Sequence, residues 1–181
     1  MRAGRLVALA LLLAMGGAAA HFIQARADRG NPPAMVLPPE QADGIEVFKA
    51  RREMVLLRDG QPIARYGIAL GANPVGPKLQ EGDERTPEGH YRIDWRNENS
   101  IAHLSLHISY PDAADQARAA AAGVAPGGNI MIHGLPNGWG VWGRWLHRYV
   151  DWTDGCIAVT NAEMDEIWAH VPNGTPIVIH P

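Results

Sequence analysis

The chain has 181 residues, 46% of them hydrophobic, and a formal net charge of -3 from 16 basic and 19 acidic residues. This length supports one globular domain with a sizeable core and leaves little room for a second. Without a dense basic block, nothing favours a nucleic-acid partner, since counterion release needs a positively charged face. Twenty glycines and fourteen prolines indicate many turns and favour a β-rich fold over a helical bundle.

The first twenty residues have the pattern of an export signal. Arg2 and Arg5 precede an apolar run from Leu6 to Ala20, which ends in small residues suited to cleavage. The run is shorter than the about 20 residues of a spanning helix. We therefore predict a signal peptide at residues 1–20; the alternative is a retained signal anchor that tethers the protein to the membrane. Both interpretations place the rest of the chain in the periplasm or cell envelope.

A proline-rich stretch separates this segment from the folded part of the chain. Residues 21–42 contain four prolines in two adjacent pairs and predict an extended linker. Residues 43–181 are expected to form the single domain.

The domain sequence predicts mostly strands. Asp59-Gly60 predicts a tight hairpin turn, and periodic apolar residues predict strands at 45–48, 54–57, 62–70, 89–95, 101–108, 129–133, 156–159 and 175–179. Helices are expected at 111–122, with Asp112 as N-cap and Gly123 as its stop, and at 161–170, with Asn161 as N-cap. This pattern predicts a mainly β fold with peripheral helices, either a β-sandwich or an open barrel.

Cys156 is the only cysteine of the chain. In an exported protein it cannot pair within the chain, so it is either a small buried apolar residue or a functional thiol. Gly155 allows a tight turn whose amides would stabilise an oxyanion. His133 ends an apolar strand and would serve as general base, oriented by a backbone carbonyl such as that of Gly134. These residues predict a nucleophilic cysteine site.

Several motifs in combination resemble the L,D-transpeptidase catalytic domain of the YkuD type. The pair His133-Gly134 and the segment Thr153–Ile157 are similar to the family's His-Gly and Ser/Thr-x-Gly-Cys motifs. The segment 82–91 is similar to its Thr-Pro-x-Gly-x-Tyr/Phe segment. Residues 106–111 and 126–128 resemble a subgroup that includes the YafK-like murein transpeptidases. The resemblance covers residues 45–179.

The resemblance implies a YkuD-like fold and a reaction on peptidoglycan stem peptides, without a cofactor. Cys156 would be acylated by a stem peptide and His133 would act as general base and acid. The carbonyl of Gly134 would orient His133, and the amides of Gly155 and Cys156 would form the oxyanion hole. The residues expected to bind substrate are Thr153, Asp154, Trp142 and Arg144.

Two residues depart from the family pattern. Asp154 stands where histidine is common, and its charge is expected to raise the pKa of the thiol. Ala158 stands where the family commonly has an arginine, which removes a cation for a substrate carboxylate. The candidates to replace it are Arg85, Arg144 and Arg148.

Other interpretations remain open. A hydrolase of the same fold would use water as acceptor and cleave stem peptides or the link to an outer-membrane lipoprotein partner. An inactive cell-wall-binding module is a further alternative. The Trp-rich stretch 135–152 is either a packed loop or a lid, and His147 within it is expected to be a lid or surface residue. His103 and His107 lack a metal-binding motif, so no metal site is expected.

Overall fold

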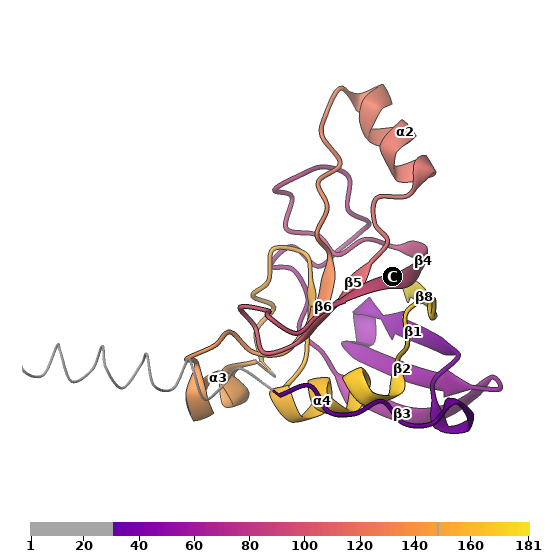
Figure 1. The fold of residues 1–181 in the computed structure, drawn as a ribbon. Helices are drawn as coiled ribbons and strands as arrows, with labels where there is room; N and C mark the ends of the chain where they lie inside the picture. The colour runs from indigo at the N-terminus through magenta and orange to yellow at the C-terminus, as the bar shows by residue number, and fades with distance from the viewer. Residues whose placement is uncertain (1–30, 148) are drawn as a thin grey trace, which may run out of the picture.

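A computed structural model describes residues 31–147 and 149–181, apart from the side chains of Val141, Trp142 and Arg144 (Figure 1). Eight strands of this part form one sheet in the order β3-β2-β1-β8-β4-β5-β6-β7. The strands are β1 Gly44–Phe48, β2 Glu53–Arg58, β3 Gln61–Gly67, β4 Gly89–Asn97, β5 Ser105–Ile108, β6 Met131–His133, β7 Ile157–Ala158 and β8 Pro176–His180. The helices are α2 Ala113–Ala122, α3 Gly140–Leu146 and α4 Asn161–His170, with 3-10 turns η1 Pro38–Glu40 and η2 Lys49–Arg51.

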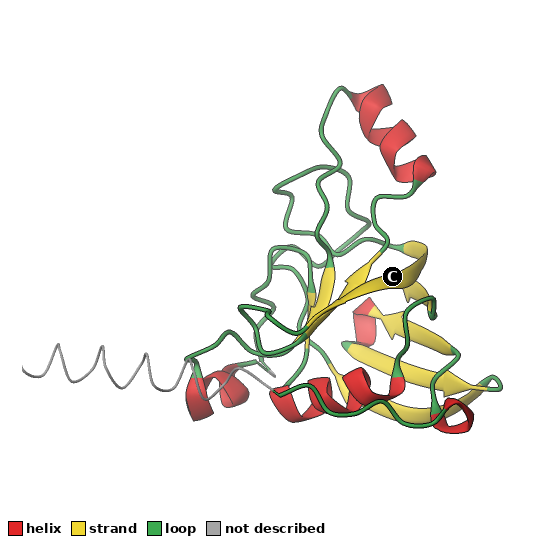
Figure 2. Cartoon of the chain, viewed as in Figure 1, coloured by secondary structure: helices red, strands yellow, loops and turns green. Residues whose placement is uncertain are grey.

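The sheet curls into a half-barrel, and the helices lie at its periphery (Figure 2). The C-terminal strand β8 joins two parts of the sheet, because it pairs in parallel with β1 and antiparallel with β4. Strands β6 and β7 form the other parallel pair. The buried face of α4 contributes Met164, Ile167 and Trp168 to the single apolar core. The prediction of a mainly β, open-barrel fold with peripheral helices is confirmed.

The predicted hairpin turn between β2 and β3 has the expected backbone. Asp59 and Gly60 have φ of 51° and 71°. Both values lie in the left-handed region that a two-residue type I′ hairpin requires. The short turn places β2 and β3 side by side at one edge of the sheet.

The structure departs most from the sequence prediction in two stretches. The strand expected over 101–108 begins only at Ser105, because His103 has a φ of 62° that breaks the extended backbone. The Trp-rich stretch contains a short helix, α3, that apolar periodicity did not predict. Gly143 permits this helix, since a Cβ there would lie 2.6 Å from the Cβ of Trp139.

Helices α2 and α4 both begin with a capping box. Asp112 caps α2 as predicted, and Gly123 ends it in the left-handed conformation. Helix α4 is capped by Thr160, one residue before the predicted Asn161. The Thr160 hydroxyl accepts a hydrogen bond from the Glu163 amide, while the Glu163 carboxylate accepts one from the Thr160 amide. Asn161 instead accepts a hydrogen bond from the amide of Leu135.

Substituting Thr160 by alanine is expected to lower the free energy of unfolding by about 1 kcal/mol, because one orphan amide of α4 loses its acceptor. Chemical denaturation followed by circular dichroism measures the change. Thr160→Ser is the control, since it keeps the hydroxyl and should stay close to the wild type. Equal stability of the alanine and serine variants would contradict the assigned cap.

Residues 36–42 lie along α4. The amide of Val36 donates to the carbonyl of Ala169, and the amide of Ala42 donates to the carbonyl of His170. Across the described ranges 31–147 and 149–181, no helix has the length and apolar character needed to cross a membrane.

Candidate active site

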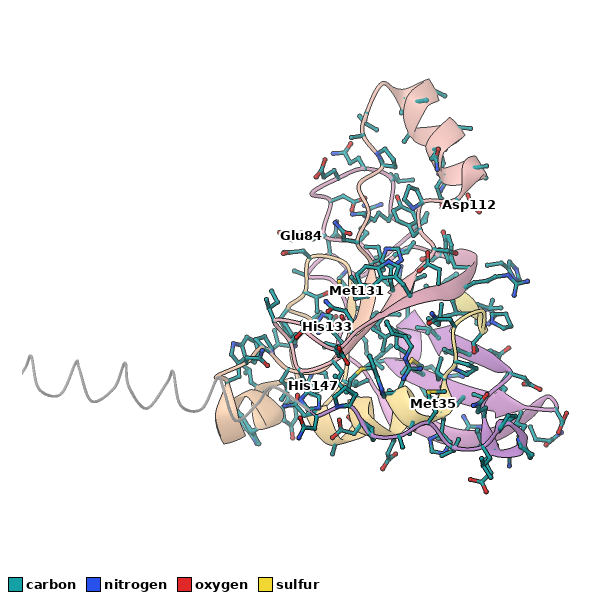
Figure 3. The ribbon with its side chains drawn as sticks, in the orientation of Figure 1. Met35, Glu84, Asp112, Met131, His133 and His147 are labelled. Carbon is teal, nitrogen blue, oxygen red and sulfur yellow. The ribbon has the colours of Figure 1, made fainter. Side chains whose placement is uncertain are left out.

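The pairing of β6 with β7 brings the two predicted motifs together. Ile132 pairs with Ile157 and His133 with Ala158. Cys156, one residue before β7, therefore lies beside Met131, whose amide donates to the Cys156 Sγ at 3.4 Å. The thiol donates to the carbonyl of Asn129 at 3.6 Å. In Figure 3, Met131 and His133 lie between Glu84 of the 71–86 loop and His147 at the end of α3.

The turn before Cys156 is closed by Thr153. The Thr153 hydroxyl donates to the carbonyl of Cys156 at 2.8 Å and accepts from the amide of Gly155 at 3.2 Å. Gly155 has a φ of 119°, and a Cβ there would lie 2.6 Å from the carbonyl oxygen of Arg85. Only glycine fits this position, because both the conformation and the space exclude a side chain.

His133 is buried, with its Nδ1 2.6 Å from the carbonyl oxygen of Gly134. A carbonyl can only accept, so Nδ1 carries the proton and Nε2 is the basic nitrogen of the neutral ring. Burial lowers the pKa of His133; the Gly134 carbonyl partly opposes this, and the charge of His147 adds to it. Gly134 also fits closely, since a Cβ there would lie 2.8 Å from the Asn161 Oδ1.

The Cys156 thiol is only partly accessible to solvent. Burial raises its pKa, and the charge of Asp154 raises it further. The hydrogen bond from the Met131 amide and the charge of Lys78 oppose these effects. A raised thiol pKa and a lowered imidazole pKa both favour the uncharged form of each group.

A cleft with a volume of about 800 Å³ lies next to the turn that carries Cys156. Its wall contains Asn129, whose carbonyl accepts from the Cys156 thiol, and Asp154, which precedes Cys156 by two residues. The other lining residues come from three loops: Lys78, Glu81, Gly82, Glu84, Tyr110, Pro111, Ala125, Pro126, Gly127 and Gly128. The cleft therefore offers room for a polar peptide beside the Cys156 turn.

The predicted substrate-binding residues have different surroundings. Asp154 is exposed and lines the cleft, whereas Thr153 is buried and contacts the turn itself. The side chains of Trp142 and Arg144 fall outside the described part of the structure, as does Arg148. His147 is predicted to be a lid or surface residue. Because it is buried, the surface alternative is wrong.

Sequence reasoning missed three contacts of the site. The amide of Met131 and the carbonyl of Asn129 are backbone groups, which leave no trace in residue type. Trp152 contacts the His133 imidazole edge to face, with ring centroids 5.7 Å apart. Its position in the Trp-rich stretch, four residues before Cys156, was the one signal that the sequence offered for this contact.

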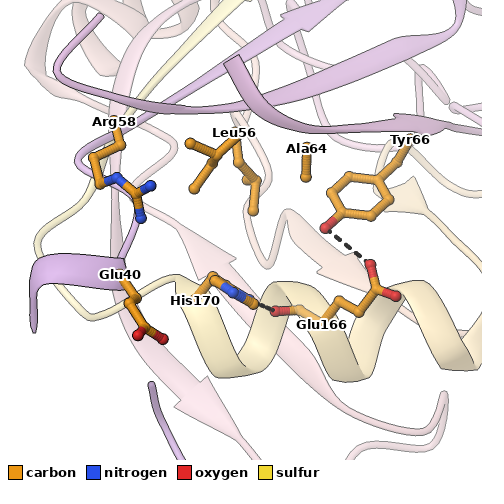
Figure 4. A pocket seen from close by; sticks show the side chains of 8 residues that line it. Glu40, Leu56, Arg58, Ala64, Tyr66, Glu166 and His170 are labelled. Carbon is orange, nitrogen blue, oxygen red and sulfur yellow. Dashed lines mark hydrogen bonds between the residues drawn. The ribbon is translucent and has the colours of Figure 1, made fainter. Parts of the chain in front are cut away.

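A separate hollow lies between β2, β3 and α4. It has a volume of about 330 Å³, and Tyr66 on its wall donates to the carboxylate of Glu166 at 3.4 Å (Figure 4). It includes none of the candidate site residues. Apolar side chains and unlike charges share its lining: Glu40, Leu56, Arg58, Ile63, Ala64, Tyr66, Glu166 and His170.

The two histidines near the site have carboxylate neighbours. His103 Nε2 lies 2.7 Å from the Asp165 carboxylate, and His107 Nδ1 lies 2.6 Å from that of Asp94. In the part of the chain that the structure describes, no three metal-ligating side chains gather in one place.

Comparison with known proteins gives a consistent match. The family model described as the L,D-transpeptidase catalytic domain, YkuD, matches residues 42–179. YafK of Escherichia coli (strain K12), whose name places it among the L,D-transpeptidases, is 30% identical over 135 residues. That alignment covers 70% of this chain and 46% of YafK. The chain thus spans about half the length of the curated relative.

Solved structures share the fold at low sequence identity. The helical cell shape determining protein Pgp2 from Campylobacter jejuni is 20% identical with a TM-score of 0.58, over 88% of this chain and 55% of that one. Bd1075 of Bdellovibrio bacteriovorus is 22% identical with a TM-score of 0.54, over 84% and 52% of the two chains. An L,D-transpeptidase from Mycobacterium smegmatis is 13% identical with a TM-score of 0.52, over 77% and 59%.

Proposed function

This chain belongs to the family of L,D-transpeptidase catalytic domains, and on that premise we propose that it is a cysteine-dependent L,D-transpeptidase acting on peptidoglycan stem peptides. The observation that supports this most is the position of the thiol. Cys156 lies beside β6, the strand that ends in His133, and its thiol donates to the carbonyl of Asn129, which lines the cleft. A nucleophile needs substrate access together with a nearby base.

The first step is acylation of the thiol. As the Cys156 sulfur attacks the carbonyl carbon of a stem-peptide bond, Nε2 of His133 takes the thiol proton. The C–S bond forms, the C–N bond breaks, and His133 returns the proton to the departing amine of the terminal D-amino acid. Because the Gly155 amide already donates to Thr153, we assign oxyanion stabilisation to the amide of Cys156.

The second step transfers the acyl group from sulfur. An amine of a second stem attacks the thioester carbonyl, His133 accepts the amine proton, and the C–S bond breaks with return of the proton to sulfur. With water as attacking group the product is a free acid, so the same residues would perform hydrolysis. The nature of the acceptor decides between cross-linking and cleavage, including cleavage of a link to an outer-membrane lipoprotein.

The departures from the family pattern bear on the substrate. Ala158 is buried in β7 and supplies no cation. Asp154 adds a negative charge to the cleft near the thiol. We propose that these residues slow acylation at neutral pH relative to a site with histidine and arginine there, because less of the thiol is ionised.

Export is part of the same proposal, since peptidoglycan lies outside the cytoplasm. We propose that residues 1–20 direct the chain to the cell envelope as a cleaved signal or as a membrane tether. N-terminal sequencing of the protein from cell-envelope fractions distinguishes these, because cleavage removes the first residues. Recovery of the protein in the cytoplasm alone would contradict export.

A carbapenem is expected to add once to the wild-type protein and not to Cys156→Ala, because Cys156 is the only cysteine in the chain. Mass spectrometry of the intact proteins measures the adduct. Absence of an adduct, under conditions in which another family member reacts, would remove the support for an acylatable thiol.

Muropeptide analysis tests the reaction itself. Purified protein incubated with peptidoglycan should produce new cross-links, and Cys156→Ala should produce none. Loss of existing links with no new ones would favour the hydrolase. An unchanged effect of the alanine variant would favour a wall-binding module and overturn the catalytic proposal.

A further inference from the structure

Trp152 contacts the imidazole of His133, and we propose that it is a positioning residue that holds His133 in its orientation on β6. The proposal rests on the proposed function, in which His133 moves the proton of the thiol. It concerns a residue outside the Cys-His pair and outside the cleft lining.

The ring geometry restricts His133 from two sides. Trp152 meets the imidazole with centroids 5.7 Å apart and an interplanar angle of 67°, an edge-to-face arrangement. On another edge of the ring, Nδ1 is bound to the carbonyl of Gly134 at 2.6 Å. Rotation of the imidazole would therefore break the hydrogen bond and collide with the indole. Such confinement keeps the base in one reactive geometry.

Trp152 is itself held by both ends of α3. Trp139, which precedes the helix, packs on it with ring centroids 4.6 Å apart. At the other end, the Trp152 Nε1 donates to the Nδ1 of His147 at 3.4 Å. Helix α3 thus supports His133 through the indole of Trp152.

The same turn carries Trp152 at its start and Cys156 at its end. Thr153, between them, is buried, and its amide donates to the carbonyl of Leu70 at 3.1 Å. Its carbonyl accepts from the amide of Ala72 at 2.9 Å. Because Thr153 also bonds to the carbonyl of Cys156, a shift of the thiol and a shift of the indole are coupled.

The charged surroundings of His133 set the direction of the expected change. The charge of His147, at the end of α3, lowers the pKa of His133, and Cys156 lies on the turn before the neighbouring strand β7. Asp151, next to Trp152, is bound by Arg52 and by the amide of Leu70. Removing the indole admits water to the ring, which reduces the desolvation that lowers the pKa of His133.

The test compares Trp152→Leu, which removes the ring but keeps an apolar side chain, with Trp152→Phe, which keeps a ring. In Trp152→Leu, NMR titration should show the His133 imidazole titrating at higher pH, closer to its ordinary value of 6.5. Its kcat should fall about 10- to 100-fold with a smaller change in KM. Trp152→Phe should stay close to the wild type in both measurements.

Trp95→Leu is the matched control, since Trp95 also contacts a histidine ring, that of His107, in a stacked arrangement with centroids 5.0 Å apart. It should change neither the His133 titration nor kcat. An unchanged His133 titration in Trp152→Leu, or a loss in Trp152→Phe as large as in Trp152→Leu, would overturn the proposal. The titration needs no substrate, so its outcome is separate from failure of the proposed reaction, which the Cys156→Ala experiments report.

Discussion

Substituting His133 by asparagine is expected to lower kcat about 10²- to 10⁴-fold, because the chain loses the group that takes and returns the proton. Asparagine suits the site, since its amide nitrogen can donate to the carbonyl of Gly134 as Nδ1 does. The fold should therefore survive while the base is lost. Rates of acyl transfer measure the effect, and thermal unfolding verifies the fold.

The pH dependence follows from two opposite shifts. The reaction needs neutral His133, and burial lowers its pKa below 6.5, so the acidic limb of kcat/KM should lie below pH 6.5. Burial raises the pKa of Cys156, so ionisation of the thiol occurs on the alkaline side of its ordinary value. Activity should thus be broad across neutral pH, and His133→Asn should lose the acidic limb.

His107→Asn is the control for this substitution. His107 is hydrogen-bonded to Asp94 and stacks on Trp95, so its loss should leave kcat and the acidic limb unchanged. An acidic limb that persists in His133→Asn would assign the titration to another group and contradict the role of His133.

The local part of the fold was predictable because its signals are local. The Asp59-Gly60 turn requires only two positive φ values, and the α2 boundaries follow from Asp112 and Gly123. The parallel pairing of β1 with β8 has no such signal, since it joins the two ends of the domain. Helix α3 is stabilised by contacts of Trp139 and His147 with Trp152, which apolar periodicity does not reveal.

The candidate site likewise has one part that the sequence predicts and one part that it does not. Cys156 and His133 are predicted from residue type and from the glycines beside them, and the β6–β7 register brings their segments together. The partners of the thiol are backbone groups of Met131 and Asn129, so residue types could not predict them. Thr153 was assigned to the substrate, yet its hydroxyl bonds within the turn, because a buried hydroxyl takes the nearest backbone partners.

Substituting Lys49 by methionine is expected to lower the free energy of unfolding by about 3–5 kcal/mol, since it leaves a charged partner without its counter-ion. The side chain of Lys49 is only 2% exposed. Its Nζ donates to the carbonyls of Gly76 and Thr86 at 2.6 and 2.9 Å and to the Glu88 carboxylate at 2.8 Å. All three protons are thus used, and burial lowers the pKa of Lys49 although Glu88 opposes this.

Two of these bonds, to the carbonyls of Gly76 and Thr86, anchor the 71–86 loop. Thr86 accepts from the amide of Gly71 through its hydroxyl, and the carbonyl of its neighbour Arg85 packs against Gly155. Loss of the ammonium should therefore loosen the surface on which the Cys156 turn rests. We expect Lys49→Met to change the rate at which iodoacetamide alkylates Cys156, as well as the stability.

Urea denaturation measures the stability change, with two comparisons. Lys49→Met/Glu88→Gln should recover part of the loss, because no unpaired carboxylate remains. Arg65→Met breaks an exposed ion pair with Glu53, in which Arg65 is 55% exposed, and should cost less than about 1 kcal/mol. A Lys49→Met loss as small as that of Arg65→Met would show that the loop is held by its backbone bonds and not by the lysine.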